Sequence, residues 1–251
     1  LAAGTACGSL FTWRRSQAVL KEWNEHTERI SSIAACGQVV VSGGFDRKVI
    51  INSSDAKTIA LHGPHNSHFV DPKHIRCVAI CPSHIAAGGS SGIVYVWARD
   101  TLELVQELKF HTKEVRAVQI ARGIVISAAE DGAVVLWSIT SGEPLFHFTQ
   151  PDGSPLPPVY ALAMQGFLVV AGDETGRAWT WSWRTDSEPA AHLDGIQVHT
   201  RAINALALQH ITSADHVPSD QPGLCEDVWA VSASSDNKVR VWSCATGVVH
   251  R

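Results

Sequence analysis

The sequence predicts an all-β fold built from repeated units of about 40 residues. Nine tryptophans are many for 251 residues, and several recur at regular intervals behind glycine-rich or polar turns. Six eleven-residue windows align without a gap: Ala3–Trp13, Ser42–Asn52, Ala87–Trp97, Ser127–Trp137, Ala171–Trp181 and Ser232–Trp242. Their fifth positions follow one another at spacings of 39, 45, 40, 44 and 61 residues. Each window starts with a small residue, passes through a turn and ends in a short apolar strand.

Each unit divides into four short strands, two of which lie in the window. In the fourth unit, for example, we expect strands at Val115–Ile120, Ile124–Ile126, within the window, and at Pro144–Phe148. The two middle strands are apolar at consecutive positions, which indicates that both faces of their sheet are buried. A two-layer sandwich would leave one face polar. The pattern therefore favours a β-propeller of four-stranded antiparallel blades, in which neighbouring blades cover both faces.

The repeat divides the chain into one propeller domain, residues 1–251. We expect a partial blade followed by five full blades, with the boundaries 1–25, 26–63, 64–110, 111–150, 151–198 and 199–251. The first unit lacks the strand that precedes its window, and a propeller must close on itself to hide its strand edges. We therefore expect a fragment of a seven-bladed ring, with a closed six-bladed ring as the alternative.

Three of the six units repeat one set of polar residues. A His-Thr dipeptide precedes the first strand, Ser opens the window and Asp occupies its fifth position. The three sets are His26, Ser42 and Asp46; His111, Ser127 and Asp131; and His199, Ser232 and Asp236. A buried carboxylate or imidazole is costly unless its polar atoms find partners, so such a set is kept whole or dropped whole.

These windows and polar sets resemble the WD40-repeat family along essentially the whole chain. The dipeptide Trp242-Ser243 stands where the family has Trp-Asp. The resemblance implies that Trp137 and Trp242 complete a Trp–Ser–His–Asp network in their units, whereas Asn52 replaces the tryptophan of the second unit. It also implies a rigid, rarely catalytic platform that binds several proteins.

His, Ser and Asp together also invite comparison with a hydrolase triad. An enzyme needs one triad, whereas this chain has three copies at the repeat spacing. The sequence Gly88–Gly92 reads G-x-S-x-G around Ser90, but it lies between two strands, not between a strand and a helix. We therefore predict no enzyme, no catalytic residue and no cofactor.

Three irregular loops are the places where function would be added. One carries His62, His65, His68, Asp71 and His74. These are metal-ligand residue types, but their spacing in a loop fixes no geometry, so we expect an exposed polar loop and no metal site. The proline-rich loop Pro151–Pro158 is a rigid connector or a docking ridge. The insertion near Gln209–Asp227 is a solvated acidic loop or an interaction segment.

The family's topology places the loops before the first strand and between the two middle strands on one face, the top face. The partner-binding residues expected there are Arg29, Arg47, Lys73, Glu114, Glu130, Glu174 and Arg201. Residues 1–125 carry a net charge of +4 and residues 126–251 a net charge of −8. Such an asymmetry would orient a charged partner, unless these are solvated loops that happen to differ in charge.

Composition narrows the function classes further. A net charge of −4 disfavours direct nucleic-acid binding, and six scattered cysteines fit reduced thiols in an intracellular protein, cytoplasmic or alternatively nuclear. Apolar runs are too short for a membrane-spanning helix. We therefore predict a non-enzymatic scaffold subunit of a multiprotein complex, with proteins and no small-molecule substrate as partners. The alternatives are a substrate-recognition propeller of a ubiquitin ligase and a ribonucleoprotein-associated subunit.

Overall fold

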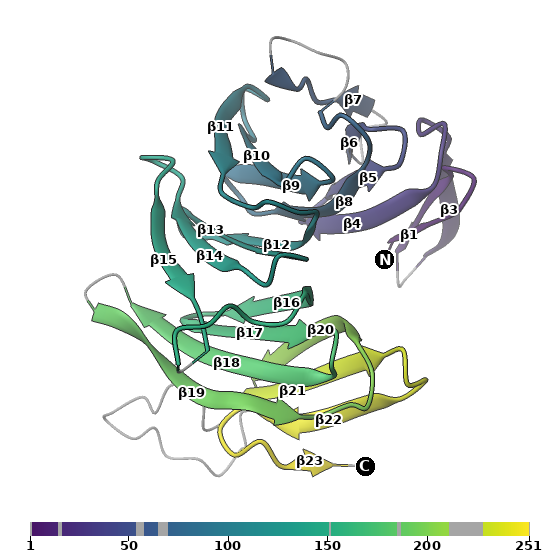
Figure 1. The fold of residues 1–251 in the computed structure, drawn as a ribbon. Helices are drawn as coiled ribbons and strands as arrows, with labels where there is room; N and C mark the ends of the chain where they lie inside the picture. The colour runs from purple at the N-terminus through teal and green to yellow at the C-terminus, as the bar shows by residue number, and fades with distance from the viewer. Residues whose placement is uncertain are drawn as a thin grey trace, which may run out of the picture. The chain divides into compact units, whose positions relative to one another are not determined.

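A computed structural model describes residues 2–14, 17–53, 58–64, 70–150, 152–184, 187–210 and 228–250 (Figure 1). These residues form six antiparallel sheets and no α-helix. None of their elements is a helix long and apolar enough to cross a membrane. The chain forms two compact units, residues 1–129 with 135–145 and residues 130–134 with 146–251.

Each sheet is built from strands that follow one another in the chain, as the repeat predicts. The first three sheets are β1 (Ala2–Gly4), β2 (Leu10–Arg14) and β3 (Gln17–Trp23); β4 (Ile30–Cys36), β5 (Val39–Gly44), β6 (Val49–Ser53) and β7 (Thr58–Ala60); and β8 (Ile75–Ile80), β9 (His84–Gly89), β10 (Ile93–Ala98) and β11 (Leu104–Lys109).

The remaining three sheets have four strands each. They are β12 (Val115–Ala121), β13 (Ile124–Ala129), β14 (Val134–Ser138) and β15 (Pro144–Phe148); β16 (Val159–Gln165), β17 (Leu168–Asp173), β18 (Arg177–Arg184) and β19 (Ser187–Gln197); and β20 (Ile203–His210), β21 (Val228–Ser234), β22 (Val239–Ser243) and β23 (Val249–His250). Each predicted blade range holds one sheet, and the number of blades in a complete ring stays a prediction.

The eleven-residue window sets the same strand register in sheet after sheet. Its first residue lies opposite its ninth, which places the turn at the same positions every time. The pairs are Ala3 with Phe11, Ser42 with Ile50, Ala87 with Tyr95, Ala171 with Trp179, and Ser232 with Arg240. Windows that align without a gap in the sequence thus pair their strands in the same register.

The second window position makes close contact with the next sheet. A β-carbon on Gly88 would lie 2.6 Å from Val115 Cγ1, at the start of β12. A β-carbon on Gly4 would lie 2.7 Å from Ile30 Cγ2, and one on Gly43 would lie 2.5 Å from Ile75 Cγ2. A β-carbon on Gly172, in the fifth repeat, would lie 2.6 Å from Ile203 Cγ2. Glycine at this position lets neighbouring sheets pack against each other without a gap.

The prediction that the middle strands are buried on both faces of their sheet is confirmed in most sheets. Every residue of β13 and of β17 is buried. The prediction is wrong for the last sheet, where Val239 is 68% exposed and Val241 is 39% exposed. Side chains alternate along a strand, so the opposite face of this sheet carries the buried Trp242 and packs against β16 and β17.

Candidate functional site

The polar set of the second unit forms one buried chain of hydrogen bonds. His26 precedes β4, Ser42 lies in β5 and Asp46 lies in the turn before β6. His26 Nδ1 lies 2.9 Å from Asp46 Oδ1, and His26 Nε2 lies 2.9 Å from Ser42 Oγ. The backbone N–H groups of Thr27 and Lys48 also donate to the Asp46 carboxylate. Burial acts to raise the pKa of Asp46, but His26 and these N–H groups outweigh it and lower the pKa.

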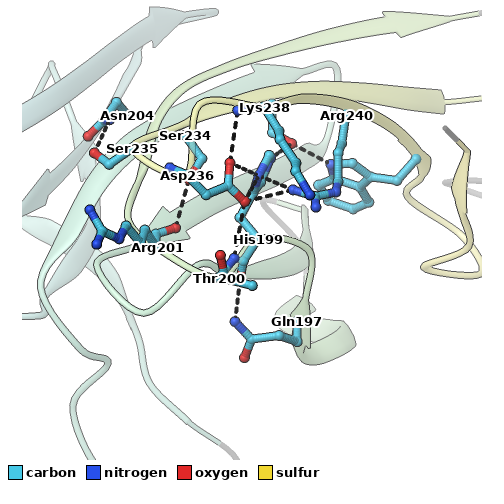
Figure 2. Close-up of polar contacts among 12 residues, drawn as sticks. Gln197, His199, Thr200, Arg201, Asn204, Ser234, Ser235, Asp236, Lys238 and Arg240 are labelled. Carbon is cyan, nitrogen blue, oxygen red and sulfur yellow. Dashed lines mark hydrogen bonds and ion pairs between the residues drawn. The ribbon is translucent and has the colours of Figure 1, made fainter.

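The sixth unit repeats this arrangement and adds a tryptophan and an arginine (Figure 2). His199 Nδ1 lies 3.0 Å from Asp236 Oδ2, and His199 Nε2 lies 2.8 Å from Ser232 Oγ. Trp242 Nε1 donates to the same Ser232 oxygen at 3.3 Å. Arg240 donates to Asp236 Oδ2 at 2.8 Å. Burial acts to raise the pKa of Asp236, but Arg240 and His199 outweigh it and lower the pKa well below its usual range.

In the fourth unit, two side chains meet on one serine. His111 Nε2 lies 2.8 Å from Ser127 Oγ, and Trp137 Nε1 donates to that oxygen at 2.8 Å. Asp131 Oδ1 accepts the backbone N–H of Ala133 at 3.0 Å, which fixes the following turn. Tryptophan, serine and histidine are therefore brought together as the family resemblance implies.

The second unit differs at its last link, as Asn52 indicates. Asn52 is 3% exposed, and its Oδ1 accepts the hydroxyl of Thr58 at 3.0 Å. Thr58 begins the outer strand β7, so this hydrogen bond joins two strands of the same sheet. Asn52, which replaces the tryptophan, thus connects β6 to β7 and not to the serine of its repeat.

The third and fifth units use a carboxylate that the sequence reasoning missed. Asp173 is 0% exposed, its Oδ1 accepts the N–H of Thr175 at 2.8 Å, and its Oδ2 accepts Trp179 Nε1 at 2.9 Å. In the third unit Asp71 is 1% exposed and accepts the hydroxyl of Ser90 and the N–H of Ser91. The signal for Asp173 was available, because the third window position is Gly, Ala or Ser in the other full units.

The prediction of an exposed histidine-rich loop is wrong at Asp71. We expected Asp71 in an exposed loop, but it is buried because its carboxylate anchors the turn between β9 and β10. Trp97 Nε1 donates to the backbone carbonyl of His62 at 2.8 Å. His65 and His68 lie outside the described residues. Within the described residues no group of three or more His, Cys, Asp or Glu could hold a metal ion.

The other irregular loops are described only in part. Pro151 and residues 211–227 of the acidic insertion lie outside the described residues. Pro155 accepts the side-chain N–H of Gln150 at 2.8 Å, and Leu156 in the same loop is buried. The proline-rich segment is therefore anchored to the protein at Leu156.

Two of the expected top-face residues, Arg29 and Glu114, belong to one group of side chains around an aromatic ring. Arg29 and Lys73 are exposed, and Glu114 is half-buried. Phe45, directly after β5, stacks on His74, directly before β8, with ring centroids 4.7 Å apart. We call the set around this ring the Phe45 cluster. Its members are Arg29, Phe45, His74, Arg76, Glu114 and Arg116.

Two guanidinium groups lie over this ring, and one of them, that of Arg76, also contacts the carboxylate of Glu114. The guanidinium carbons of Arg29 and Arg76 lie 5.3 Å and 5.4 Å from the centroid of Phe45. Glu114 Oε1 contacts Arg76 Nε, lies 3.3 Å from His74 Nε2 and lies 3.8 Å from Arg116 Nη1. The motif search did not find Phe45, His74, Arg76 or Arg116 as a group, because they come from three successive sheets.

The remaining expected top-face residues have other surroundings. Arg47 is half-buried with a backbone φ of 68°, and its carbonyl accepts the N–H of Val70. In the fifth repeat, Glu174 accepts the hydroxyl of Tyr160 at 3.4 Å. The carbonyl of the exposed Arg201 accepts the hydroxyl of Ser234, and Glu130 is half-buried. These residues stay a prediction as partner contacts.

The repeated sheets and their polar networks define an all-β protein of the β-propeller class. A family model described as "WD domain, G-beta repeat" matches residues 17–51, which contain β3, β4 and β5. This match and the repeat that runs through all six windows make the chain similar to proteins with WD40 repeats.

Curated proteins and solved structures include several that are similar to the chain. It is 29% identical over 172 residues, 65% of its length, to NACHT domain- and WD repeat-containing protein 1 of Homo sapiens. It is 36% identical over 63 residues, 24% of its length, to Protein SPA1-RELATED 3 of Arabidopsis thaliana. These regions cover 10% and 8% of the relatives, so the chain spans about a tenth of their length.

The crystal structure of the computationally designed Ika8 protein matches the fold with a TM-score of 0.71. The two chains are 24% identical, and the match covers 98% of this chain and 69% of that chain. This likeness concerns the fold alone.

Proposed function

We propose that the chain is a non-enzymatic scaffold that binds other proteins as a subunit of a multiprotein complex. WD40 propellers are in general protein-interaction domains, which supports this assignment. The observation that carries it is the Phe45 cluster, a group of cationic and aromatic side chains at the surface of a unit held by buried networks. Arginine and aromatic side chains are enriched where proteins bind each other.

A catalytic role for the His–Ser–Asp sets is disfavoured by burial. Ser42, Ser127 and Ser232 are each 0% exposed, so a substrate cannot reach their hydroxyl groups. Two of these hydroxyl oxygens also accept a tryptophan N–H. Ser90, in the G-x-S-x-G sequence, donates to Asp71. We infer that these groups hold the sheets together.

The test is purification of the parent protein from its source, with mass spectrometry of the proteins that accompany it. A parallel sample carries Arg29→Glu and Lys73→Glu, two exposed residues of the expected top face. Lys109→Glu, 64% exposed on the outer strand β11, is the matched control. We expect a fixed set of companions that is lost with the double variant and kept with the control. No stable companions in any sample would contradict the scaffold.

The same experiment separates the two alternatives. A substrate-recognition propeller of a ubiquitin ligase would yield companions that are captured only transiently and accumulate when protein degradation is blocked. A ribonucleoprotein-associated subunit would lose its companions after ribonuclease treatment, and its binding would weaken steeply with salt. Companions that are stable, and resistant to both treatments, favour the scaffold.

A further inference from the structure

We propose that the Phe45 cluster binds an acidic peptide segment of a partner protein through the carboxylates of that segment. This inference rests on the proposed function and names the partner chemistry of its site. The cluster combines three arginines, one histidine and one carboxylate, and the exposed Lys73 precedes His74. Its charge therefore favours an anionic partner.

The aromatic ring prepares the guanidinium groups for binding. Arg29 and Arg76 both lie over Phe45, and the contact of a guanidinium with an aromatic face holds an otherwise flexible side chain. Binding a carboxylate then costs less side-chain entropy than it would on a free arginine.

The carboxylate of Glu114 occupies the position that we expect a carboxylate of the partner to take. Its single oxygen Oε1 is contacted by Arg76, Arg116 and His74, so the guanidinium groups already accommodate a carboxylate. The side chains of Arg76, Glu114 and Arg116 are 25%, 17% and 22% exposed, which leaves this site within reach of solvent. The Nε atom of Arg76 is buried, so a carboxylate from a partner would compete with Glu114 for the other nitrogens of the Arg76 and Arg116 guanidinium groups.

The same geometry argues against single-stranded nucleic acid as the partner. Such ligands bind by stacking successive bases on aromatic side chains. The ring of Phe45 is already stacked on His74 at an interplanar angle of 24° and has two guanidinium groups over it. Hydrogen-bond donors, rather than a free aromatic face, are what the cluster offers.

The test measures binding of a fluorescent peptide of alternating Glu and Gly to the full chain by fluorescence anisotropy. A peptide of alternating Gln and Gly is the uncharged control. We expect saturable binding of the Glu peptide only, weakened about fivefold by Arg76→Gln and about threefold by Phe45→Leu, which keeps an apolar side chain. Lys109→Gln removes a positive charge from the same unit outside the cluster and should leave the affinity unchanged.

The direction of the affinity change in Glu114→Gln separates the proposal from a purely structural role of Glu114. Removing the competing carboxylate should tighten binding of the Glu peptide about threefold, whereas loss of a merely structural residue would weaken it. Weaker binding in this variant would overturn the proposal, and so would equal weakening by Lys109→Gln and Arg76→Gln. Unchanged thermal unfolding midpoints ensure that the variants are folded.

Two further ligands test the source of the anion. Tighter binding of a single-stranded oligonucleotide, or of a phosphoserine peptide of matched length, would overturn the assignment to carboxylates. If no peptide binds but companions still accompany the purified parent protein, this inference fails and the scaffold stands. If companions are absent as well, the proposed function fails with it.

Discussion

Gly88→Ala tests whether the second window position sets the distance between sheets. Gly88 lies in β9 and faces Val115, the first residue of β12. The added β-carbon would lie 2.6 Å from Val115 Cγ1, 2.9 Å from Val115 Cβ and 3.2 Å from Cys77 Sγ. Carbon atoms in contact prefer separations of about 3.5–4.0 Å, so β9 and β12 would have to move apart.

Two effects of opposite sign decide the result. Replacing glycine by alanine at a compatible backbone conformation stabilises a protein by about 0.4–1 kcal/mol, because the unfolded chain loses freedom. Overpacking a well-packed core costs about 1–3 kcal/mol. Val115 is 0% exposed and has no room to yield. We therefore expect Gly88→Ala to lower the free energy of unfolding by about 1–2 kcal/mol, measured by urea denaturation.

A double-mutant cycle with Val115→Ala locates the cause. Val115→Ala removes the atom at 2.6 Å and leaves Cβ at 2.9 Å, a contact that a shift of a few tenths of an ångström relieves. The two changes together should be less destabilising than the sum of the single changes, by about 1 kcal/mol. A stabilising Gly88→Ala, or an additive cycle, would refute the packing argument.

Three further predictions concern the networks and the thiols. Trp137→Phe keeps an aromatic side chain but removes the N–H donor to Ser127 and leaves a space where the larger indole ring packed, so we expect urea denaturation to give a loss of about 2–4 kcal/mol; no loss would contradict a role for that hydrogen bond. Because the pKa of Asp236 is lowered by folding, its contribution to stability is present above its unfolded pKa of about 4 and is lost as the pH falls through the folded value. Urea midpoints between about pH 2 and pH 7 should therefore decline more steeply in the wild type than in Asp236→Asn, and parallel curves would argue against the ion pair. Burial raises the pKa of Cys77 to about 12, whereas hydrogen bonds from Thr5 and Ser9 lower that of the exposed Cys7, so a thiol reagent should modify Cys7 early and Cys77 only after unfolding.

The sequence predicted the register of the sheets because the repeat is long and its turn chemistry recurs. It also predicted which histidine meets which serine, since each pair occupies equivalent places in successive units. It did not predict the role of Asp173, although a charged residue at a window position that is Gly, Ala or Ser in the other full units was a visible signal. Asp71 was expected in an exposed loop, because spacing along the chain does not show that its carboxylate contacts the turn between β9 and β10.

The Phe45 cluster shows a second limit of sequence reasoning. Its residues come from four separate segments: the end of the loop before β4, the turn after β5, the start of β8 and the start of β12. The family resemblance led us to expect Arg29 and Glu114 on the top face, but it could not give the orientation of the side chains. The stacking of Phe45 on His74 depends on that orientation.

The constant register has a consequence for how this chain tolerates changes in length. Successive windows are separated by 39 to 61 residues, yet in five sheets the first window residue faces the ninth. The segments between windows therefore differ in length while the pairing of the strands stays the same. We expect an insertion placed in one of these segments to leave the register of its own sheet unchanged.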